Sequence, residues 1–531
     1  MNLPASQTYT LSADINVKKI NAILKDANMT LVGNACEPPC ESEEGTVLDT
    51  FDAVVYNSNA LLIQIGSDLL RICWSGDSMV QAAPESEWKF AGDLPQGPVR
   101  DLLMKQSSLR AFMPVGQVTL VRDTLSLLDD EHKTCCRIES ITLNRGKHTW
   151  SWLRTCPMRG YSDSHALICG ILEKMEKPAL PSEVLKLRIS DYTSKPAILL
   201  SENDPARTSL CTIVQAFLQV TRRNEPGLIE DLDTEFLHQW RVSLRKVRSV
   251  LTLFKGVVAP DTLDRLKQDF RDIMQDTNLM RDRDVYLLSR NDYFALVPPQ
   301  AHPGLGVLFE MLQRDRDEAF EKVKTLLKSK AYKKQIKSIQ KLFENPEDLP
   351  QGPKADAPSK KFAANLVLKR YKTVCRLAAN ITDKTPDETI HELRIHCKKL
   401  RYLIESAQPL FDDNQVKDLL KTLKGLQEHL GSFNDQSVQQ ATLAHCLERY
   451  PSTEPNAKAL AESIGALMAM LYRKQLDERR MIIENLSGFY SPQTQAAFHA
   501  LFDLKRIAAN PKPETGGQDK TQVDSGGDKE L

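Results

Sequence analysis

One eleven-residue pattern occurs twice in this chain, at residues 238–248 and again at 391–401. In each copy a histidine is followed by basic residues three, seven, eight and ten positions later, with apolar residues between them. The two copies are 153 residues apart, and the same offset aligns residues outside the pattern, such as Arg223 with Arg376. Because this register holds without gaps over residues 223–285, it predicts two copies of one structural unit.

The spacing of the basic residues predicts two amphipathic helices. Each residue of an α-helix advances by about 100°, so positions 0, 3, 7 and 10 fall within roughly 80° of one another. Solvated helices usually mix charges of both signs, whereas these faces repeat cationic or titratable residues that repel one another. A bound polyanion that neutralises this face explains the repeated cations better than exposure to solvent does. The candidate anion-binding residues are His238, Arg241, Arg245, Lys246 and Arg248, and His391, Arg394, Lys398, Lys399 and Arg401.

The duplicated pattern closely resembles the CHAD domain, the conserved-histidine α-helical domain. Each copy is followed by an aspartate near a valine, Asp282 with Val285 and Asp435 with Val438, and the resemblance covers roughly residues 201 to 508. It implies two four-helix bundles related by pseudo-twofold symmetry, whose basic groove or pore binds inorganic polyphosphate. It further implies phosphate contacts for Arg241, Arg245, Arg248, Arg394, Lys398 and Arg401.

The two leading histidines, His238 and His391, admit a second interpretation as metal ligands. No second potential metal ligand occurs at the same position in both copies, since His396 of the second copy aligns with Ser243 of the first. We therefore expect the histidines to donate hydrogen bonds to phosphate or within the bundle, and we expect no metal and no cofactor. The two aspartates are expected to cap helices or to form salt bridges between bundles. No nucleophile is paired with a base, so the helical part gives no case for hydrolysis.

Composition restricts where a basic site can lie. Lys plus Arg and Asp plus Glu both total 70 in 531 residues, so a cationic site must be local.

The 11 cysteines are odd in number and scattered, which is typical of reduced thiols in a cytosol, and Cys36 and Cys40 lack the other half of a zinc site. The sequence shows neither a secretory signal nor a membrane-spanning run. We expect a bacterial cytoplasmic protein, associated with polyphosphate or storage granules and with proteins on them.

The first 200 residues have a different pattern. Alternating apolar and polar residues at Leu61–Ile65, Leu69–Trp74, Gly116–Arg122 and Cys136–Leu143 predict strands of a mostly antiparallel sheet. Helical periodicity at Val17–Lys25 predicts one early helix. The amino-terminal part is therefore expected to be an α+β domain.

The order of these features is similar to that of the CYTH, or triphosphate tunnel, domain, which is often fused ahead of CHAD. The features are a strand at Thr8–Asp14, the early helix, and the segments Asp49–Asp52, Glu87–Trp88 and Arg159–Tyr161. Active tunnel enzymes begin with Glu-x-Glu-x-Lys, which holds metal and triphosphate, and carry arginines on a following strand.

This chain departs from the tunnel pattern at both places. The first strand reads Thr10-Leu-Ser12-Ala-Asp14, and Leu62 and Gln64 stand where arginines are expected. Triphosphate hydrolysis needs carboxylates to position a metal and cations to neutralise the phosphoryl oxygens. We therefore predict a degenerate CYTH-like scaffold without activity. The alternative is a metal-dependent inorganic triphosphatase in which the CHAD domain recruits the substrate.

A second basic segment and a second polyanion, nucleic acid, are alternatives to this assignment. Lysines between residues 322 and 341 could extend the polyanion surface, although a solvated helix explains them equally well because the second copy is much less basic there. Nucleic acid is a less favoured partner than polyphosphate, because the basic faces lack stacking aromatics apart from Trp240 and Tyr402, which lie off the shared positions.

The complete expectation is an antiparallel β domain followed by an all-α domain of two helical repeats. The expected boundaries are 1–200 for the degenerate CYTH-like domain, 201–345 for the first CHAD repeat, 346–360 for a proline-rich linker, 361–510 for the second repeat and 511–531 for a disordered tail.

Overall fold

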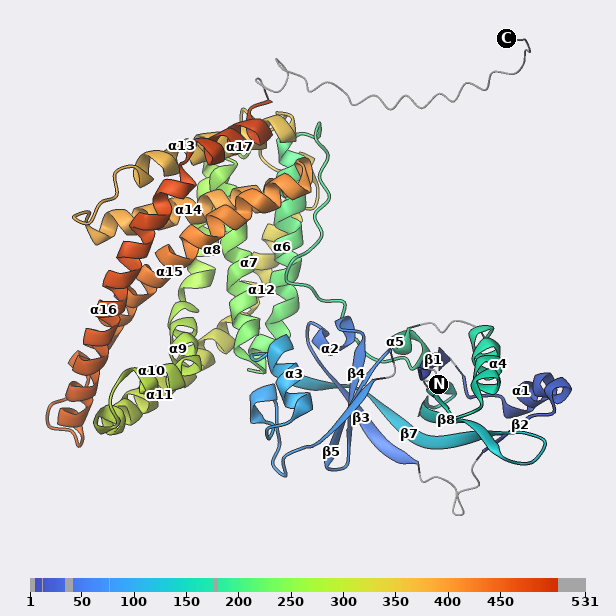
Figure 1. Ribbon diagram of the computed structural model, residues 1–531. Helices are drawn as coiled ribbons and strands as arrows, with labels where there is room; N and C mark the ends of the chain where they lie inside the picture. The colour runs from blue at the N-terminus through green and yellow to red at the C-terminus, as the bar shows by residue number, and fades with distance from the viewer. Residues whose placement is uncertain (1–4, 12, 34–41, 76, 176–179, 505–531) are drawn as a thin grey trace, which may run out of the picture. The chain divides into compact units, whose positions relative to one another are not determined.

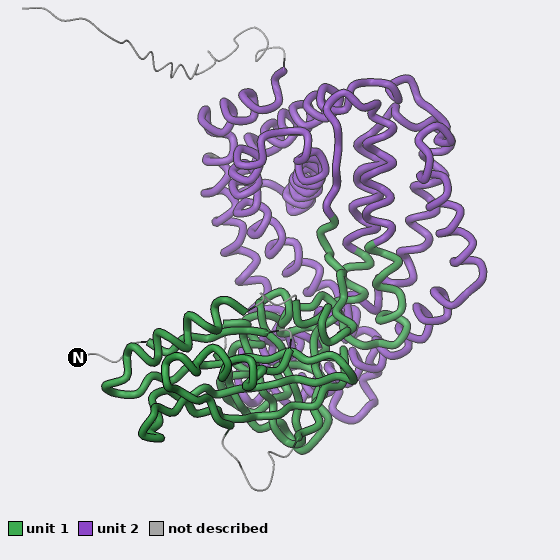
Figure 2. The backbone as a smooth tube through the Cα atoms, turned by 90° about the vertical axis from the view of Figure 1, so that its right-hand side faces the viewer, with its two compact units in different colours: residues 1–196, 220–241 green, residues 197–219, 242–531 purple. Residues whose placement is uncertain are grey.

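The computed structural model describes residues 5–11, 13–33, 42–75, 77–175 and 180–504 (Figure 1). Ser12, Cys36, Cys40 and the predicted tail at 511–531 lie outside these residues. Backbone contacts divide the chain into two compact units (Figure 2), residues 1–196 with 220–241 and residues 197–219 with 242–531. Within the described segments, no helix combines the length and the hydropathy that a membrane span requires.

The amino-terminal unit is built on a nine-stranded antiparallel sheet in the order β1-β9-β8-β7-β3-β4-β5-β6, with β2 paired to β7. Four predicted strand segments lie in β4, β5, β7 and β8, except that β5 ends one residue before Trp74, and the predicted strand at Thr8–Asp14 overlaps β1, which confirms the predicted antiparallel β domain. The strands are β1 (Gln7–Leu11), β2 (Thr30–Gly33), β3 (Glu43–Thr50), β4 (Ala60–Ile65), β5 (Asp68–Cys73), β6 (Ser78–Ala82), β7 (Phe112–Leu128), β8 (Thr134–Arg145) and β9 (His148–Pro157).

Short helices complete this unit. The predicted helix at Val17–Lys25 is α1 (Val17–Leu24), which begins where the side chain of Asn16 accepts a hydrogen bond from the Lys19 amide at 2.9 Å. The other helical segments are η1 (Lys25–Ala27), α2 (Val54–Asn57), η2 (Ala91–Asp93), α3 (Pro98–Gln106), α4 (Ser162–Glu173) and α5 (Pro181–Val184). The arrangement is compatible with the predicted CYTH-like fold.

The remaining helices form the carboxy-terminal region. They are α6 (Ala206–Ile229), α7 (Thr234–Leu253), α8 (Pro260–Gln275), α9 (Asn278–Leu288), α10 (Arg290–Leu296), η3 (Pro299–Ala301), α11 (His302–Lys328), α12 (Lys330–Leu342), η4 (Pro346–Asp348), α13 (Ser359–Ala378), α14 (Asp387–Ala407), η5 (Gln408–Leu410), α15 (Asp413–Arg449), α16 (Ala457–Phe489) and α17 (Pro492–Phe502). The predicted pattern helices are α7 and α14. The sequence did not predict α9 and α10.

The start of α7 is fixed by contacts within the amino-terminal unit. The carboxylate of Asp233 accepts hydrogen bonds from the amides of Glu235 and Phe236, which caps the helix. Arg110 places Nη1 3.2 Å from Oδ1 of the same aspartate, and its guanidinium lies 4.8 Å from the ring centre of Phe236. The amino-terminal unit therefore anchors the first turn of the helix that carries the first basic pattern.

The two helical repeats are related by pseudo-twofold symmetry. The amide of Ala206 donates to the carbonyl of Ala357 at 2.8 Å, and the amide of Ser359 donates to the carbonyl of Asp204 at 2.9 Å. The second bond is the first with each partner exchanged for its equivalent 153 positions away. Likewise, α13 begins 153 residues after α6, and α15 begins 153 residues after α8.

Each repeat contributes a four-helix bundle. In the second, α13, α14, α15 and α17 contact one another in a ring. In the first, side-chain contacts link α6 to α12 through Gln215 and α12 to α8 through Gln335. A further apolar core is shared between the repeats, because residues of α9, α10 and α11 pack against residues of α15 and α16. The predicted linker runs between the repeats and donates from Gly352 to the carbonyl of Val257 at 2.8 Å.

The close packing of α11 against α16 can be tested at two glycines of one helix. A methyl group at Gly304 would overlap the carbonyl oxygen of Ala459 and the hydroxyl of Ser463, whereas one at Gly306 would meet nothing within 4 Å. We expect Gly304→Ala to lower the free energy of unfolding by about 1–3 kcal/mol through overpacking.

The matched control is Gly306→Ala. This change should raise the free energy of unfolding by about 0.5–1 kcal/mol, because alanine favours the helix more than glycine does. The measurement is the urea transition of the full chain, followed by far-UV circular dichroism. Equal transitions for the two variants would contradict the close approach of α11 and α16.

Candidate functional site

The pattern helices α7 and α14 line one cavity of about 400 Å³. It brings together five of the ten candidate residues, and none of the described lining residues is acidic. The lining residues are Arg245, Arg248, Ser249 and Thr252 of α7, and Arg394, Lys398, Lys399 and Tyr402 of α14.

The cationic faces are held in place by the apolar residues between them. On α14, Leu393, Cys397 and Leu400 are fully buried, and on α7 Leu244 and Val247 are fully buried. Since apolar residues at helical spacing occupy one side of each helix, the basic residues of the pattern are directed to another side. The predicted division of each helix into a packing side and a cationic side is therefore present in the structure.

Lys398 lies in the most strongly perturbed environment of the cavity. Burial, together with the nearby charges of Arg394 and Arg245, lowers its pKa from 10.5 to about 8. Burial also lowers the pKa of Arg394, against the opposing effect of Asp435. The cavity therefore concentrates positive charge in a partly desolvated space.

Two guanidinium groups of the cavity have unmet donors. The Nε atoms of Arg245 and Arg394 are buried and have no hydrogen-bond acceptor in the described parts of the chain. A buried donor without an acceptor is costly, and a phosphate oxygen is a strong acceptor for it. Arg248 places Nη1 3.8 Å from Sδ of Met274, and burial with the nearby Arg271 lowers its pKa. These three arginines are thus suited to an anionic ligand.

Three other candidates are already engaged. Lys246 lies 3.9 Å from a carboxylate oxygen of Glu405 and 4.8 Å from the ring centre of Phe217. Arg401 donates from Nε to Glu405 at 2.6 Å. His391 is exposed and places Nδ1 2.5 Å from Oδ1 of Asn434. In this structure the three side chains therefore interact with other side chains of the protein.

Of the remaining candidates, Lys399 lines the cavity, whereas His238 and Arg241 are not among its described lining residues. His238 and Arg241 lie on the first turns of α7 and are partly buried. Lys399 has a pKa lowered by burial and by Arg370. Asp435 accepts from Nη2 of Arg394 at 3.5 Å, and because both residues belong to the second repeat, this ion pair lies within one bundle and not between bundles as predicted. In the described ranges, no three His, Cys, Asp or Glu side chains form a group suited to a metal.

Four residues at the site are not in the predicted anion-binding set. Ser249, Thr252 and Tyr402 line the cavity, and Glu405 pairs with two of the candidate cations. A signal for two of them was present, since Thr252 and Glu405 lie fourteen positions after the leading histidines and continue the same helical face.

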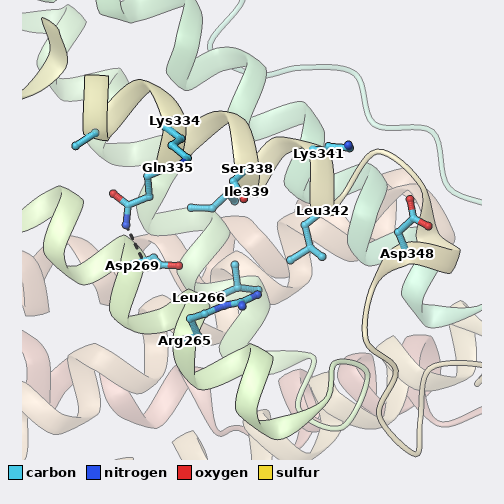
Figure 3. A pocket seen from close by; sticks show the side chains of 11 residues that line it. Arg265, Leu266, Asp269, Lys334, Gln335, Ser338, Ile339, Lys341, Leu342 and Asp348 are labelled. Carbon is cyan, nitrogen blue, oxygen red and sulfur yellow. Dashed lines mark hydrogen bonds between the residues drawn. The ribbon is translucent and has the colours of Figure 1, made fainter. Parts of the chain in front are cut away.

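A second, larger cavity of about 800 Å³ lies between α8 and α12 (Figure 3). Arg265 lines it from α8, and Lys334 and Lys341 line it from α12. The five lysines of α12 are exposed, and none has an ion-pair partner among the described residues: Lys330, Lys333, Lys334, Lys337 and Lys341. Two carboxylates, Asp269 and Asp348, also line this cavity, so its charge is mixed.

Comparisons with known proteins identify the helical region. The model of the CHAD domain family matches residues 212–444. The crystal structure of the CHAD domain from the plant Ricinus communis is 25% identical with a TM-score of 0.47, covering 55% of this chain and 95% of that chain. PptA from Streptomyces chartreusis is 16% identical with a TM-score of 0.43, covering 54% of this chain and 99% of that chain. No curated protein matches the chain.

The crowding of charge in the cavity predicts the titration of Lys398. Its pKa should lie near 8 in the free protein, and Arg394→Met should raise it toward the ordinary 10.5 by removing a neighbouring cation. Between those pH values the unfolded chain holds the proton more tightly, so the free energy of unfolding should rise with pH, and Lys398→Met should remove this rise.

The measurement is ¹³C NMR of labelled lysine side chains, with the Lys398→Met variant used to assign the signal. Urea transitions between pH 7.5 and 10.5 follow stability. A lysine that titrates at its ordinary value in the wild type would contradict the crowded cavity.

Proposed function

Because residues 212–444 form a CHAD domain, we propose that this protein binds inorganic polyphosphate without chemically changing it, in the cavity lined by α7 and α14. One observation carries the proposal. Both repeats direct basic residues into a single cavity with no acidic residue among its described lining, and two buried guanidinium donors there lack acceptors. The resemblance to the CHAD family suggests polyphosphate as the ligand, and the basic residues of the cavity suit a polyanion.

Polyphosphate suits this arrangement because negative charge runs along its whole length. Arginine can bind phosphate oxygens through two parallel hydrogen bonds, and lysine provides a mobile point charge. Successive helical turns are about 5.4 Å apart, so residues on one face can meet nearby phosphates of one chain. An anion beside Lys398 stabilises its protonated form, so binding near pH 8 is accompanied by proton uptake.

The same chemistry defines the proposed partners and location. A protein that binds polyphosphate is recruited where the polymer accumulates, including polyphosphate or storage granules in a bacterial cytoplasm. Proteins on such granules are further candidate partners. The proposed domains are a degenerate CYTH-like domain at 1–200, CHAD repeats at 201–345 and 361–510, and a connecting segment at 346–360.

A triphosphatase activity of the amino-terminal unit has less support. One apolar cluster against the sheet includes Trp150, Trp152 and Leu187, and another includes the fully buried Leu62. Apolar side chains supply neither metal ligands nor cations for a triphosphate. A phosphate-release assay with magnesium or manganese tests this alternative directly.

Nucleic acid is a weaker candidate ligand than polyphosphate. Single-stranded nucleic acids are usually held by stacking of bases on aromatic side chains, and Tyr402 is the one aromatic residue among the described lining of the cavity. Trp240, the other aromatic residue near the pattern, is fully buried in the core. Competition between polyphosphate and DNA therefore distinguishes the two ligands.

The central test is binding of long-chain polyphosphate to the wild type and to Arg245→Gln with Arg248→Gln. These arginines line the cavity without a carboxylate partner among the described residues. Their loss should weaken binding by about 10- to 100-fold, because each charge-assisted phosphate contact is strong. The slope of log affinity against log salt should also fall by about 1.5, since each contact contributes roughly 0.7–0.9.

The measurement is isothermal titration calorimetry at three salt concentrations, with duplex DNA as competitor. The control is Arg473→Gln with Lys474→Gln, which removes two exposed charges from α16 and should leave affinity unchanged apart from a small general effect. Equal loss in both double variants, or displacement of polyphosphate by DNA, would show that binding depends on general charge and not on the cavity.

The lysines of α12 provide a separate prediction. If α12 extends the polyanion surface, Lys334→Gln with Lys337→Gln and Lys341→Gln should weaken binding of long chains and leave tripolyphosphate unaffected, because three phosphates are too few to occupy the basic pattern and α12 together. Calorimetry with the two ligands measures this difference. An unchanged affinity for long chains would assign these lysines to a solvated helix face.

A further inference from the structure

Among the positions at which α7 and α14 differ, one has a neutral side chain in the first repeat and a carboxylate in the second. Thr252 of the first repeat aligns with Glu405 of the second. Thr252 lines the cavity and donates its hydroxyl to the carbonyl of Arg248 at 2.8 Å, so it presents no charge. Its equivalent presents a carboxylate. The pseudo-symmetric scaffold therefore does not itself require an acid at this place.

The carboxylate of Glu405 bridges basic residues from both repeats. One oxygen accepts from Nε of Arg401 at 2.6 Å, and the other lies 3.9 Å from Nζ of Lys246. The side chains of Glu405 and Lys246 are 25% and 18% exposed, so this group is partly shielded from water and salt. Both cations belong to the set that the pattern assigns to the polyanion.

We propose, on the basis of the proposed function, that Glu405 is an internal competitor that makes the site select long polyphosphate over small phosphate anions. A ligand that uses Lys246 and Arg401 must displace the carboxylate. Exchange of one anion for another yields little free energy, because each cation is paired before and after. A single phosphate therefore gains little at these two residues.

The free energy of binding at these two residues differs for a long polyphosphate chain. Once part of it occupies the cavity beside Arg245, Arg248 and Lys398, its next phosphates reach Lys246 and Arg401 as an intramolecular step at high effective concentration. The polymer can then displace Glu405, whereas free phosphate or pyrophosphate at the same total concentration cannot. Glu405 thus suppresses occupation of the site by abundant small anions at a modest cost in affinity for the polymer.

The test compares tripolyphosphate with long-chain polyphosphate in the wild type, Glu405→Gln and Glu405→Thr. Thr reproduces the residue of the first repeat, and Gln retains the shape and the hydrogen-bond acceptor for Arg401. We expect the affinity for tripolyphosphate to rise about tenfold in both variants, as for removal of one competing charge. Affinity for the long chain should rise by a smaller factor, so the ratio of the two dissociation constants should fall.

Glu392→Gln is the matched control, since it removes a negative charge from another side of the same helix, where Glu392 lies 3.9 Å from His396. It should leave the ratio unchanged. A wild type that binds the long chain but gives the same ratio as both Glu405 variants would overturn the role of Glu405 and leave the proposed function standing. Absence of polyphosphate binding in the wild type and all variants would instead overturn the proposed function.

Discussion

Confinement of like charges is the constraint on which the helical region depends. Burial, together with the nearby charges of Arg394 and Arg245, lowers the pKa of Lys398 to about 8. Such a cluster opposes folding, so it must be held by packing elsewhere. The buried residues of α7 and α14 provide that packing, and the capped start of α7 at Asp233 fixes where the first cationic face begins. The fold holds these like charges close together, and a bound anion would reduce the repulsion between them.

The two repeats relieve this repulsion to different degrees. On α14, Arg394 has Asp435 at 3.5 Å and Arg401 has Glu405 at 2.6 Å, whereas Arg248 of α7 has Met274 near its guanidinium. Among the arginines that line the cavity, Arg394 of the second repeat therefore has a carboxylate beside it, whereas Arg245 and Arg248 of the first have none among the described residues. The basic positions recur in both repeats, and so does the aspartate at 282 and 435, whereas Glu405 of the second repeat stands where the first has Thr252. The resulting site has a symmetric backbone and an asymmetric distribution of charged side chains.

Much of this arrangement could be predicted from the sequence because it depends on local periodicity. The offset of 153 residues and the helical spacing predicted α7, α14 and their cationic sides. The sequence did not predict α9, whose buried residues include the charged Arg283 and Asp284, because its apolar pattern is interrupted by a buried salt-bridge network. The engagement of Lys246 by Glu405 also could not be predicted, since it joins two helices distant in sequence. Periodicity identifies a helix face, but only tertiary packing determines what that face meets.

The reciprocal hydrogen bonds near Pro205 and Pro358 have the symmetry of a homodimer interface. A contact in which each residue meets its own equivalent is self-complementary, as in a twofold symmetric homodimer. Tyr286 and Gln439 repeat this relation, since they are also separated by 153 positions and are joined by a hydrogen bond of 3.3 Å. In this protein both sides of the contact belong to one chain, so they can carry different residues, which two identical chains meeting through the same surface could not.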